Sequence, residues 1–255
     1  MKYIDLNSDV GEGFGSYKSF EDERLYQIIT SANIACGYHA GDPMIMEETI
    51  NLCNKNKVEL GAHPGFPDLL GFGRRKMDVT KEEAANYSLY QLGALHGIAK
   101  VMGKELQHFK LHGAFYNMVM SDYEISKHII QKVKAFQSNL VFLGLANSAF
   151  IEACKSEGVK YASEVFADRA YDRNGQLVSR KLQGAIIKDK GKAIEQVKRI
   201  VLYGEVKTID ETIIKLDADS ICIHGDNEEA LCFADNIRSS LEKEGVKFQP
   251  LKSFR

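Results

Sequence analysis

The sequence predicts an α/β fold in which one parallel β/α barrel spans residues 1–255. The first observation is a repeating pattern: a short β-branched run, then a polar cluster, then an amphipathic helix. The second is the number of such runs, about seven, which favours a distorted or incomplete (β/α) barrel. The third is a length that suits one barrel domain, with only four prolines and no low-complexity linker. A doubly wound open sheet is the alternative, although no GxGxxG motif follows the first strand in a helix-opening context.

The predicted strands share one composition. Each combines β-branched or aromatic residues with a following cluster of Gly, His, Asn or Asp, which marks the end of a strand. The segment 139–143 is the most apolar of them, whereas 3–7 carries the polar residues Asp5 and Asn7. The strands are expected at residues 3–7, 33–35, 58–62, 108–111, 139–143, 160–165 and 220–223.

Capping residues indicate where two of the intervening helices begin. Asp42 precedes Pro43, a pairing typical of an N-cap followed by proline at the first helical position. Thr80 and Glu83 have the spacing of a capping box, in which each side chain satisfies a backbone N–H near the other. The long helix that they open has an apolar stripe and is expected to stop at Gly103.

The remaining helices are predicted by weaker signals. Ser19 is expected to cap the first helix, with Asp22 as a weaker capping-box partner. Ser121 and Glu124 have the spacing of a further capping box. Residues 206–216 suit either a hairpin turned at an Asp-Glu pair or a short helix capped by threonine, and we favour the hairpin. Further helices are expected from about residues 149, 190 and 228.

Charge and composition exclude several classes of protein. The formal net charge is −2, so neither nucleic acid nor an anionic membrane is expected as a partner. No stretch is apolar for long enough to cross a bilayer, and Asp5 and Asp9 interrupt any apolar N-terminal signal. The five cysteines are odd in number and lack CxxC spacing, which is typical of reduced thiols in the cytoplasm. We therefore expect a cytoplasmic protein.

Acidic and amide side chains are concentrated in and after the first strand. The period of two residues places Asp5, Asn7 and Asp9 on one face, and Glu12 follows in a glycine-rich turn. An outward-facing polar stripe is the simpler interpretation, but helices should cover the outside of a barrel. Charges that point inward must contact water, a metal or a substrate, because an unpartnered buried charge is costly. We therefore predict that these residues belong to a site.

Histidines follow the strands at equivalent positions. One histidine of this kind is usually structural, but four of the chain's seven do so, with small residues beside them. Barrel enzymes take their catalytic residues from several strand ends, so these side chains are expected to meet at one mouth. The four are His39, His63, His112 and His224, and Asn33 and Asp226 belong to two of the same segments.

Two chemistries fit these residues. Asp9, or Asp5 in its place, forms with His39 and His63 a ligand set for a divalent metal that activates water. The same histidines and carboxylates also suit general acid–base catalysis without a metal. Sequence spacing does not separate the two chemistries, because the residues come from different strands.

Basic residues form a second group. Arg74 lies in a glycine-flanked loop, and Arg169 and Arg180 flank an Asn-Gly turn, where guanidinium groups suit carboxylate or phosphate binding. Taken singly, each arginine is more often a solvated surface residue. Lys110 differs, because a lysine on the inner face of a strand must pair with a carboxylate or an anionic ligand.

Short motifs run along the chain at residues 5–12 (DLNSDVGE), 31–42 (SANIACGYHAGD), 61–65 (GAHPG), 71–75 (GFGRR), 110–117 (KLHGAFYN), 166–171 (FADRAY) and 222–226 (CIHGD). In content and order they closely resemble the LamB/YcsF family, whose members are also called the A subunit of 5-oxoprolinase. The resemblance is specific, because the motifs extend nearly from end to end. Two departures, Phe115 where leucine is common and Ser179 where proline is common, remove no polar group.

The resemblance implies a seven-stranded β/α barrel of the glycoside hydrolase/deacetylase type. It also implies ATP-dependent opening of 5-oxo-L-proline to L-glutamate, together with two partner subunits, ATP and Mg²⁺. The sequence has no Walker-type loop, which leaves either an unfamiliar nucleotide site here or one at a partner interface. A stand-alone metal-dependent deacetylase or amidohydrolase is the rival interpretation, and a non-catalytic substrate-binding subunit is a third.

The predicted site combines these residues in three roles. Catalysis is assigned to Asp9, His39, His63, Lys110, His112, His224 and Asp226. Binding of substrate or phosphate is assigned to Asn7, Glu12, Asn33, Arg74, Asp168, Arg169 and Arg180. Binding of a divalent metal, as the alternative chemistry, is assigned to Asp9, His39 and His63.

Overall fold

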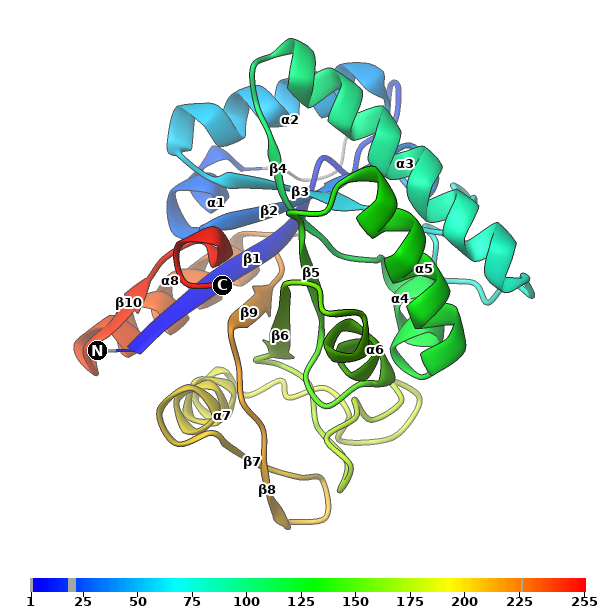
Figure 1. Ribbon diagram of the computed structural model, residues 1–255. Coiled ribbons are helices and arrows are strands. Elements are labelled where there is room, and N and C mark those ends of the chain that lie inside the picture. Colours follow the sequence, from blue (N-terminus) through cyan, green and yellow to red (C-terminus); the bar gives the residue numbers. More distant parts are fainter. Residues whose placement is uncertain (1, 18–21, 226) are drawn as a thin grey trace.

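The computed structural model describes residues 2–17, 22–225 and 227–255, and it has the fold of a closed parallel barrel (Figure 1). Seven strands pair in the order β1-β2-β3-β4-β5-β6-β9, and β9 pairs with β1 to close the ring. The predicted barrel is therefore confirmed, and the open doubly wound sheet is excluded. The strands are β1 (Lys2–Val10), β2 (Ser31–Ala35), β3 (Glu59–His63), β4 (Leu106–Phe109), β5 (Val141–Leu145), β6 (Tyr161–Phe166) and β9 (Ser220–Ile223).

Helices cover the outside of the barrel (Figure 1). Asp42 caps the second of them as predicted, and Thr80 and Glu83 form the expected capping box. Asp22 is the N-cap of the first, whereas the predicted cap Ser19 lies outside the described residues. The helices are α1 (Glu23–Ile28), α2 (Pro43–Asn56), α3 (Lys81–Val101), α4 (Gly113–Met120), α5 (Tyr123–Phe136), α6 (Ala149–Glu157), α7 (Lys190–Tyr203) and α8 (Glu228–Lys243).

The structure corrects the prediction in the segment around α4. Ser121 does not cap α5, because it ends α4, and the side chain of Asp122 accepts the capping hydrogen bond from Ile125 N instead. Helix α4 itself has no sequence signal, since its N-cap residue His112 makes no side-chain capping bond. Strand β4 ends at Phe109, two residues earlier than expected, and this places Lys110 in the loop that leads to α4.

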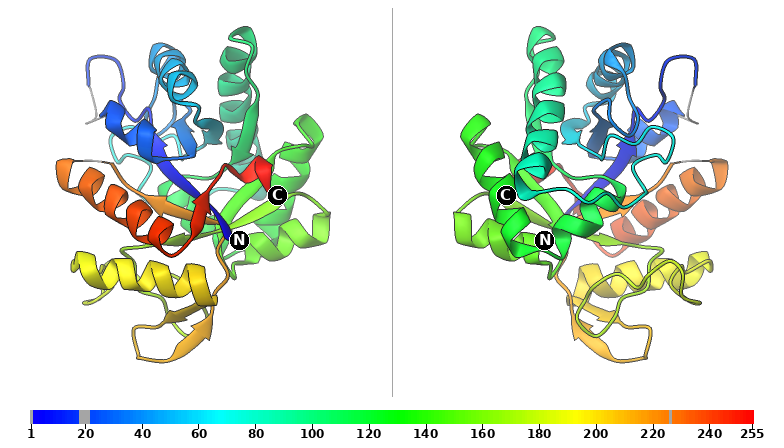
Figure 2. Two further views of the ribbon diagram at one scale, coloured as in Figure 1. Left: turned by 90° about the vertical axis from the view of Figure 1, so that its left-hand side faces the viewer. Right: turned by 90° about the vertical axis from the view of Figure 1, so that its right-hand side faces the viewer.

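Two short additions lie outside the barrel strands. The residues 206–216 form an antiparallel hairpin of β7 (Glu205–Lys207) and β8 (Ile213–Lys215), as predicted, and it projects from one end of the molecule (Figure 1). Strand β10 (Val246–Phe248) was not predicted, and it pairs in parallel with the first residues of β1. This pairing places β10 beside the start of β1 (Figure 2).

Much of the interior of the barrel is polar. In β1 to β3, apolar side chains alternate with polar ones and pack outward against the helices, in keeping with the period of two, whereas β5 has no polar side chain. Near the start of β1 the carboxylate of Asp5 accepts hydrogen bonds from the hydroxyls of Thr30, Ser31 and Ser220. Leu251, in the short 3₁₀ turn η1 (Leu251–Ser253), packs against strands β5 and β6. Among the described residues, no helix is long and apolar enough to span a bilayer.

Candidate active site

A cavity of about 210 Å³ opens at the C-terminal ends of the strands. Barrel enzymes place their reactive groups at this end, because the loops that follow the strands converge there. The walls are completed by residues that the sequence did not predict for the site, among them Tyr116, Asn117 and Phe166. Eight predicted residues line the cavity: Asp9, His63, Arg74, Lys110, His112, Arg169, Arg180 and His224.

Lys110 is buried at the floor of this cavity. Its Nζ lies 3.0 Å from Asn7 Oδ1, 3.3 Å from Asp9 Oδ1, 3.1 Å from Glu164 Oε2 and 3.2 Å from Cys222 Sγ. Burial opposes the charge of the ammonium group, but the neighbouring Asp9, Cys222 and Glu164 hold the pKa of Lys110 well above its usual value. The expected pairing of this lysine with a carboxylate is therefore confirmed, and a fixed cation faces the cavity.

Asp9 is the anion beside this cation. Its Oδ1 accepts a hydrogen bond of 2.9 Å from Asn33 Nδ2 and lies 3.3 Å from both Lys110 Nζ and His63 Nε2. Burial raises the pKa of Asp9, but the neighbouring His63 and Lys110 outweigh it and lower the pKa well below the usual value. Asp9 therefore stays ionised and is placed to accept a proton or to orient a base.

A hydrogen-bonded layer beneath the cavity positions these groups. Asn33 Nδ2 also donates to Asn7 Oδ1 at 2.8 Å, and His108 Nε2 donates to Asn33 Oδ1 at 2.7 Å. A Cβ at Gly61 would lie 2.0 Å from His108 Nε2, so glycine at this strand position makes room for the imidazole. Asn7 and Asn33 thus support the site from below and do not line the cavity.

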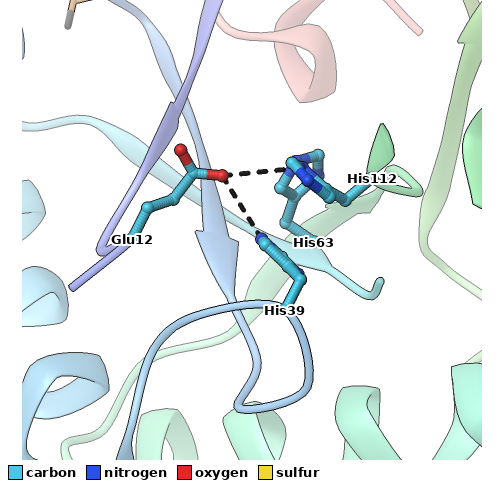
Figure 3. Close-up of side chains that lie close together, drawn as sticks. All are labelled: Glu12, His39, His63 and His112. Atoms are coloured by element: carbon cyan, nitrogen blue, oxygen red, sulfur yellow. Dashed lines mark hydrogen bonds and ion pairs between the residues drawn. The ribbon is translucent and has the colours of Figure 1, made fainter. Parts of the chain in front are cut away.

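Three of the predicted histidines and one glutamate form a cluster next to the cavity (Figure 3). Glu12 Oε1 lies 3.2 Å from His39 Nε2 and 3.5 Å from His112 Nδ1, and His63 Nε2 lies 3.0 Å from His112 Nδ1. The rings of His39 and His112 are stacked, with centroids 3.7 Å apart. Asp9, which the sequence suggested as a metal ligand with His39 and His63, is not one of this group; Glu12 and His112 take its place.

A tight loop after β3 holds the imidazole rings of His39 and His112 in position. His112 Nε2 donates to the carbonyl of Phe72 at 2.9 Å, and Phe72 has a positive φ of 53°, which is strained for a bulky residue. The next residue, Gly73, has a φ of 63°, and a Cβ there would lie 2.8 Å from His39 Cβ and 2.9 Å from His112 Cδ2. This close approach requires glycine, and the loop therefore holds the stacked pair in place.

Three arginines border the cavity. Within the described part of the chain, no carboxylate forms an ion pair with Arg74, Arg169 or Arg180. Arg169 is buried, and its Nη2 donates to the carbonyl of Val178 at 2.7 Å, whereas its Nε has no partner among the described residues. Burial and the nearby Arg180 lower the pKa of Arg169. The mouth is thus electropositive and suits an anionic group.

Not every predicted residue lies in this cavity. Asp168 lines a second cavity of about 400 Å³ between the ends of β6 and β9 and helices α7 and α8, and His224 borders both cavities. Asp226 lies outside the described residues. Sequence reasoning missed Glu164 and His108, although both are polar residues inside strands. The signal that identified Lys110, a charge on the inner face of a strand, would also have identified Glu164.

The buried histidines are expected to make the protein sensitive to acid. Burial, then the neighbouring Lys110 and His63, lower the pKa of His108 to about 3, below the 6.5 of an exposed histidine. Below pH 6.5 the histidine is protonated in the unfolded chain but stays neutral in the folded chain. Its contribution to the free energy of unfolding is therefore fully present above pH 6.5 and is lost as the pH falls. Between pH 7 and pH 5 this histidine alone should remove about 2 kcal/mol from the free energy of unfolding.

Urea denaturation of the wild type and of His108→Gln at both pH values measures this effect. Glutamine can still donate to Asn33 but does not titrate, so the variant should lose about 2 kcal/mol less than the wild type. Burial raises the pKa of Asp5 to about 6, so its protonation stabilises the folded chain as the pH falls. This effect is the same in the wild type and in the variant, and it cancels when their losses of stability are compared. Equal losses in the two proteins would contradict the assignment.

Comparisons with known proteins show the family of this chain. The LamB/YcsF family matches residues 4–255. The chain is 52% identical over 254 residues, covering all of both chains, to the 5-oxoprolinase A subunit of Campylobacter jejuni subsp. jejuni serotype O:23/36 (strain 81-176). It is 51% identical over 251 residues, 98% of both chains, to the 5-oxoprolinase A subunit of Pyrococcus abyssi. The crystal structure of the lactam utilization protein from Thermus thermophilus is similar, with a TM-score of 0.91 at 39% identity over 98% of this chain and 99% of that one. The chain therefore belongs to the LamB/YcsF family.

Proposed function

We propose that this chain is the A subunit of an ATP-dependent 5-oxoprolinase, which hydrolyses 5-oxo-L-proline to L-glutamate while ATP is converted to ADP and phosphate. The names of its full-length relatives support the role in 5-oxoprolinase. The observation that carries the proposal is a group of three arginines, Arg74, Arg169 and Arg180, that border a small cavity lined also by Asp9 and Lys110. Among the described residues, no carboxylate forms an ion pair with these arginines. Such a site suits a small substrate that carries a carboxylate and reacts by proton transfer.

The reaction needs activation, because a five-membered lactam is an unreactive amide. Transfer of the terminal phosphoryl group of ATP to the amide oxygen makes the amide carbonyl carbon electrophilic and releases ADP. Water then adds to that carbon, the carbon–nitrogen bond breaks, the nitrogen takes up a proton, and the opened ring is an acyl phosphate. A second water hydrolyses the acyl phosphate to glutamate and phosphate. The chain must therefore bind anionic groups and move protons at one place.

The residues of the site divide into these two roles. Lys110, Arg74 and Arg169 hold the phosphate or the substrate carboxylate, since each is a cation that borders the cavity. Asp9 and His63 handle the proton of the attacking water, because their side chains are in contact and both face the cavity. The proton network is completed by His39, His112, His224 and Asp226, and substrate binding is completed by Arg180.

The nucleotide and the partners belong to the same proposal. The sequence contains no Walker-type loop, so ATP with Mg²⁺ is bound in the assembled complex with two other 5-oxoprolinase subunits. The complex works in the cytoplasm, where ATP is available and where the reduced state of the five cysteines is maintained.

An assay for release of glutamate from 5-oxoproline tests this function. The chain is assayed alone and together with its two presumed partner subunits, with and without ATP. Turnover is expected only when all subunits and ATP are present. Absence of glutamate from the complete mixture, with each subunit shown to be folded, would refute the proposal.

A stand-alone metal-dependent amidohydrolase or deacetylase is the second candidate function. The group of Glu12, His39, His63 and His112 favours it, because its side chains are typical metal ligands. This candidate predicts amide hydrolysis by the isolated chain without ATP, and loss of that activity on treatment with a chelator. The assay of the isolated chain therefore separates the two candidates.

A further inference from the structure

We propose that Glu12, His39, His63 and His112 bind one divalent transition-metal ion, and that Zn²⁺ is the ion they fit best. The donor set, three imidazoles and one carboxylate, is typical of zinc sites in proteins. The inference does not depend on the reaction proposed above, because it rests on how these four side chains are held. It also differs from the set expected from the sequence, since Asp9 is not a member.

Backbone carbonyls determine which nitrogen of two histidines carries the proton. His63 Nδ1 lies 2.9 Å from the carbonyl oxygen of Lys110, and a carbonyl can only accept, so this nitrogen is the donor. His112 Nε2 donates in the same way to the carbonyl of Phe72 at 2.9 Å. In a neutral imidazole the other nitrogen then has a lone pair. Metal-binding histidines are commonly oriented by this kind of hydrogen bond to their second nitrogen.

The two lone pairs point at one another. His63 Nε2 and His112 Nδ1 are 3.0 Å apart, yet both hydrogen atoms of the neutral rings are committed to carbonyls. Glu12 Oε1 lies 3.5 Å from His112 Nδ1, and Asp9 Oδ1 lies 3.3 Å from His63 Nε2, which adds negative charge to the same place. Two imidazole lone pairs that face each other without a hydrogen atom between them repel, so this arrangement favours a cation at its centre.

The spacing of the donor atoms suits a tetrahedral ion. Ligands bound to zinc at about 2.0–2.1 Å in a tetrahedron stand about 3.3 Å from one another. The separations from Glu12 Oε1 to His39 Nε2 and to His112 Nδ1 are 3.2 Å and 3.5 Å, and the two facing histidine nitrogens are 3.0 Å apart. All four donor atoms lie within 4.8 Å of one another. The His39 and His112 rings are stacked with their planes 4° apart, so one of the two must turn before both nitrogens can bind the same ion in their ring planes. His39, whose Nδ1 makes no hydrogen bond to the described residues, is the ring expected to turn.

His39 differs from the other two histidines. Its Nδ1 is buried and has no partner among the described residues, and a Cβ at Gly65 would lie 2.5 Å from this atom. No hydrogen bond to this second nitrogen therefore orients the ring, and His39 is expected to be the weakest of the three histidine ligands. His63 and His112 also line the cavity, so the bound ion would border the space where the substrate is proposed to lie.

Metal binding by the full-length chain tests the proposal. The chain is stripped with a chelator and titrated with Zn²⁺ in competition with a chromogenic indicator, and the Co²⁺ form is examined by visible absorption. We expect one ion per chain and the intense visible bands of tetrahedral cobalt. His63→Ala and His112→Ala should each weaken zinc binding by at least about 100-fold, and His39→Ala should weaken it less.

Two further variants control for folding and for surface histidines. Glu12→Gln keeps the size of a partly exposed side chain and should also weaken binding, while circular dichroism verifies the fold. His128→Ala removes a surface histidine that contacts Glu82, and it should bind zinc like the wild type. Much less than one ion per chain, or unchanged affinity in any of the four ligand variants, would overturn the proposal. Because the measurement is binding, its outcome is independent of whether the complex hydrolyses 5-oxoproline.

Discussion

Replacement of Lys110 by methionine is expected to lower the free energy of unfolding by about 3–5 kcal/mol and to abolish turnover. The methionine side chain fills a similar volume but has no charge. It leaves the carboxylates of Asp9 and Glu164 close to one another in a buried site, without the cation that lies 3.3 Å and 3.1 Å from them. Desolvated like charges without a counterion are among the most destabilising arrangements in a protein interior. Urea denaturation at neutral pH measures the loss.

Two variants determine whether the effect arises from the buried charges. Lys132→Met removes a lysine that pairs with Glu82 at the surface, and it should cost less than about 1 kcal/mol. The double variant Lys110→Met/Glu164→Gln removes one of the stranded carboxylates and should recover part of the stability, although not the activity. If Lys110→Met unfolded at the same urea concentration as the wild type, the buried ion cluster would not contribute to stability.

Replacement of Asp9 by asparagine is expected to reduce glutamate production by the assembled complex about 10²–10⁴-fold, the range found for loss of a general acid–base group. Asparagine has the same shape and can still accept the hydrogen bond from Asn33, so the fold should be kept. The negative charge beside His63 and Lys110 would be lost, and with it the group that orients or accepts the proton. His63→Ala should have a comparable effect for the same reason.

Glutamate release and ATP hydrolysis are measured separately for this variant. Asp235→Asn, at an exposed position on α8, serves as the matched control and should keep wild-type turnover. Calorimetry with 5-oxoproline distinguishes a loss of binding from a loss of chemistry, and near-normal binding with impaired turnover is expected. Wild-type turnover in both Asp9→Asn and His63→Ala would refute the catalytic roles of these residues.

The fold was predictable because its signals are local. Asp42 with Pro43, and Thr80 with Glu83, mark the starts of α2 and α3 by capping bonds that form within a few residues. Helix α4 and strand β10 were missed for the opposite reason. The first begins directly after His112, whose side chain makes no capping bond, and the second is a three-residue strand that forms by pairing with β1 at the other end of the chain.

The site was predictable in outline, since its histidines each follow a strand. Parallel strands of a closed barrel end at one rim, so His63, His112 and His224 had to approach the same mouth. Which groups touch was not predictable in this way. The contact of Glu12 with His39 depends on a turn after β1, and the position of His112 depends on a loop after β3 that belongs to a different part of the sequence.

The sequence by itself determined the barrel, the end of the barrel where the chemistry lies, and most of the side chains that face it. It could do so because the strand period and helix capping depend on residues close together in the sequence, and because consecutive strands usually pair with one another. Only the tertiary structure decided that Glu164 pairs with Lys110, and that Glu12 contacts His39 and His112 while Asp9 contacts His63. Those contacts depend on distances between loops and strands that are far apart in the sequence, and no local sequence pattern predicts them.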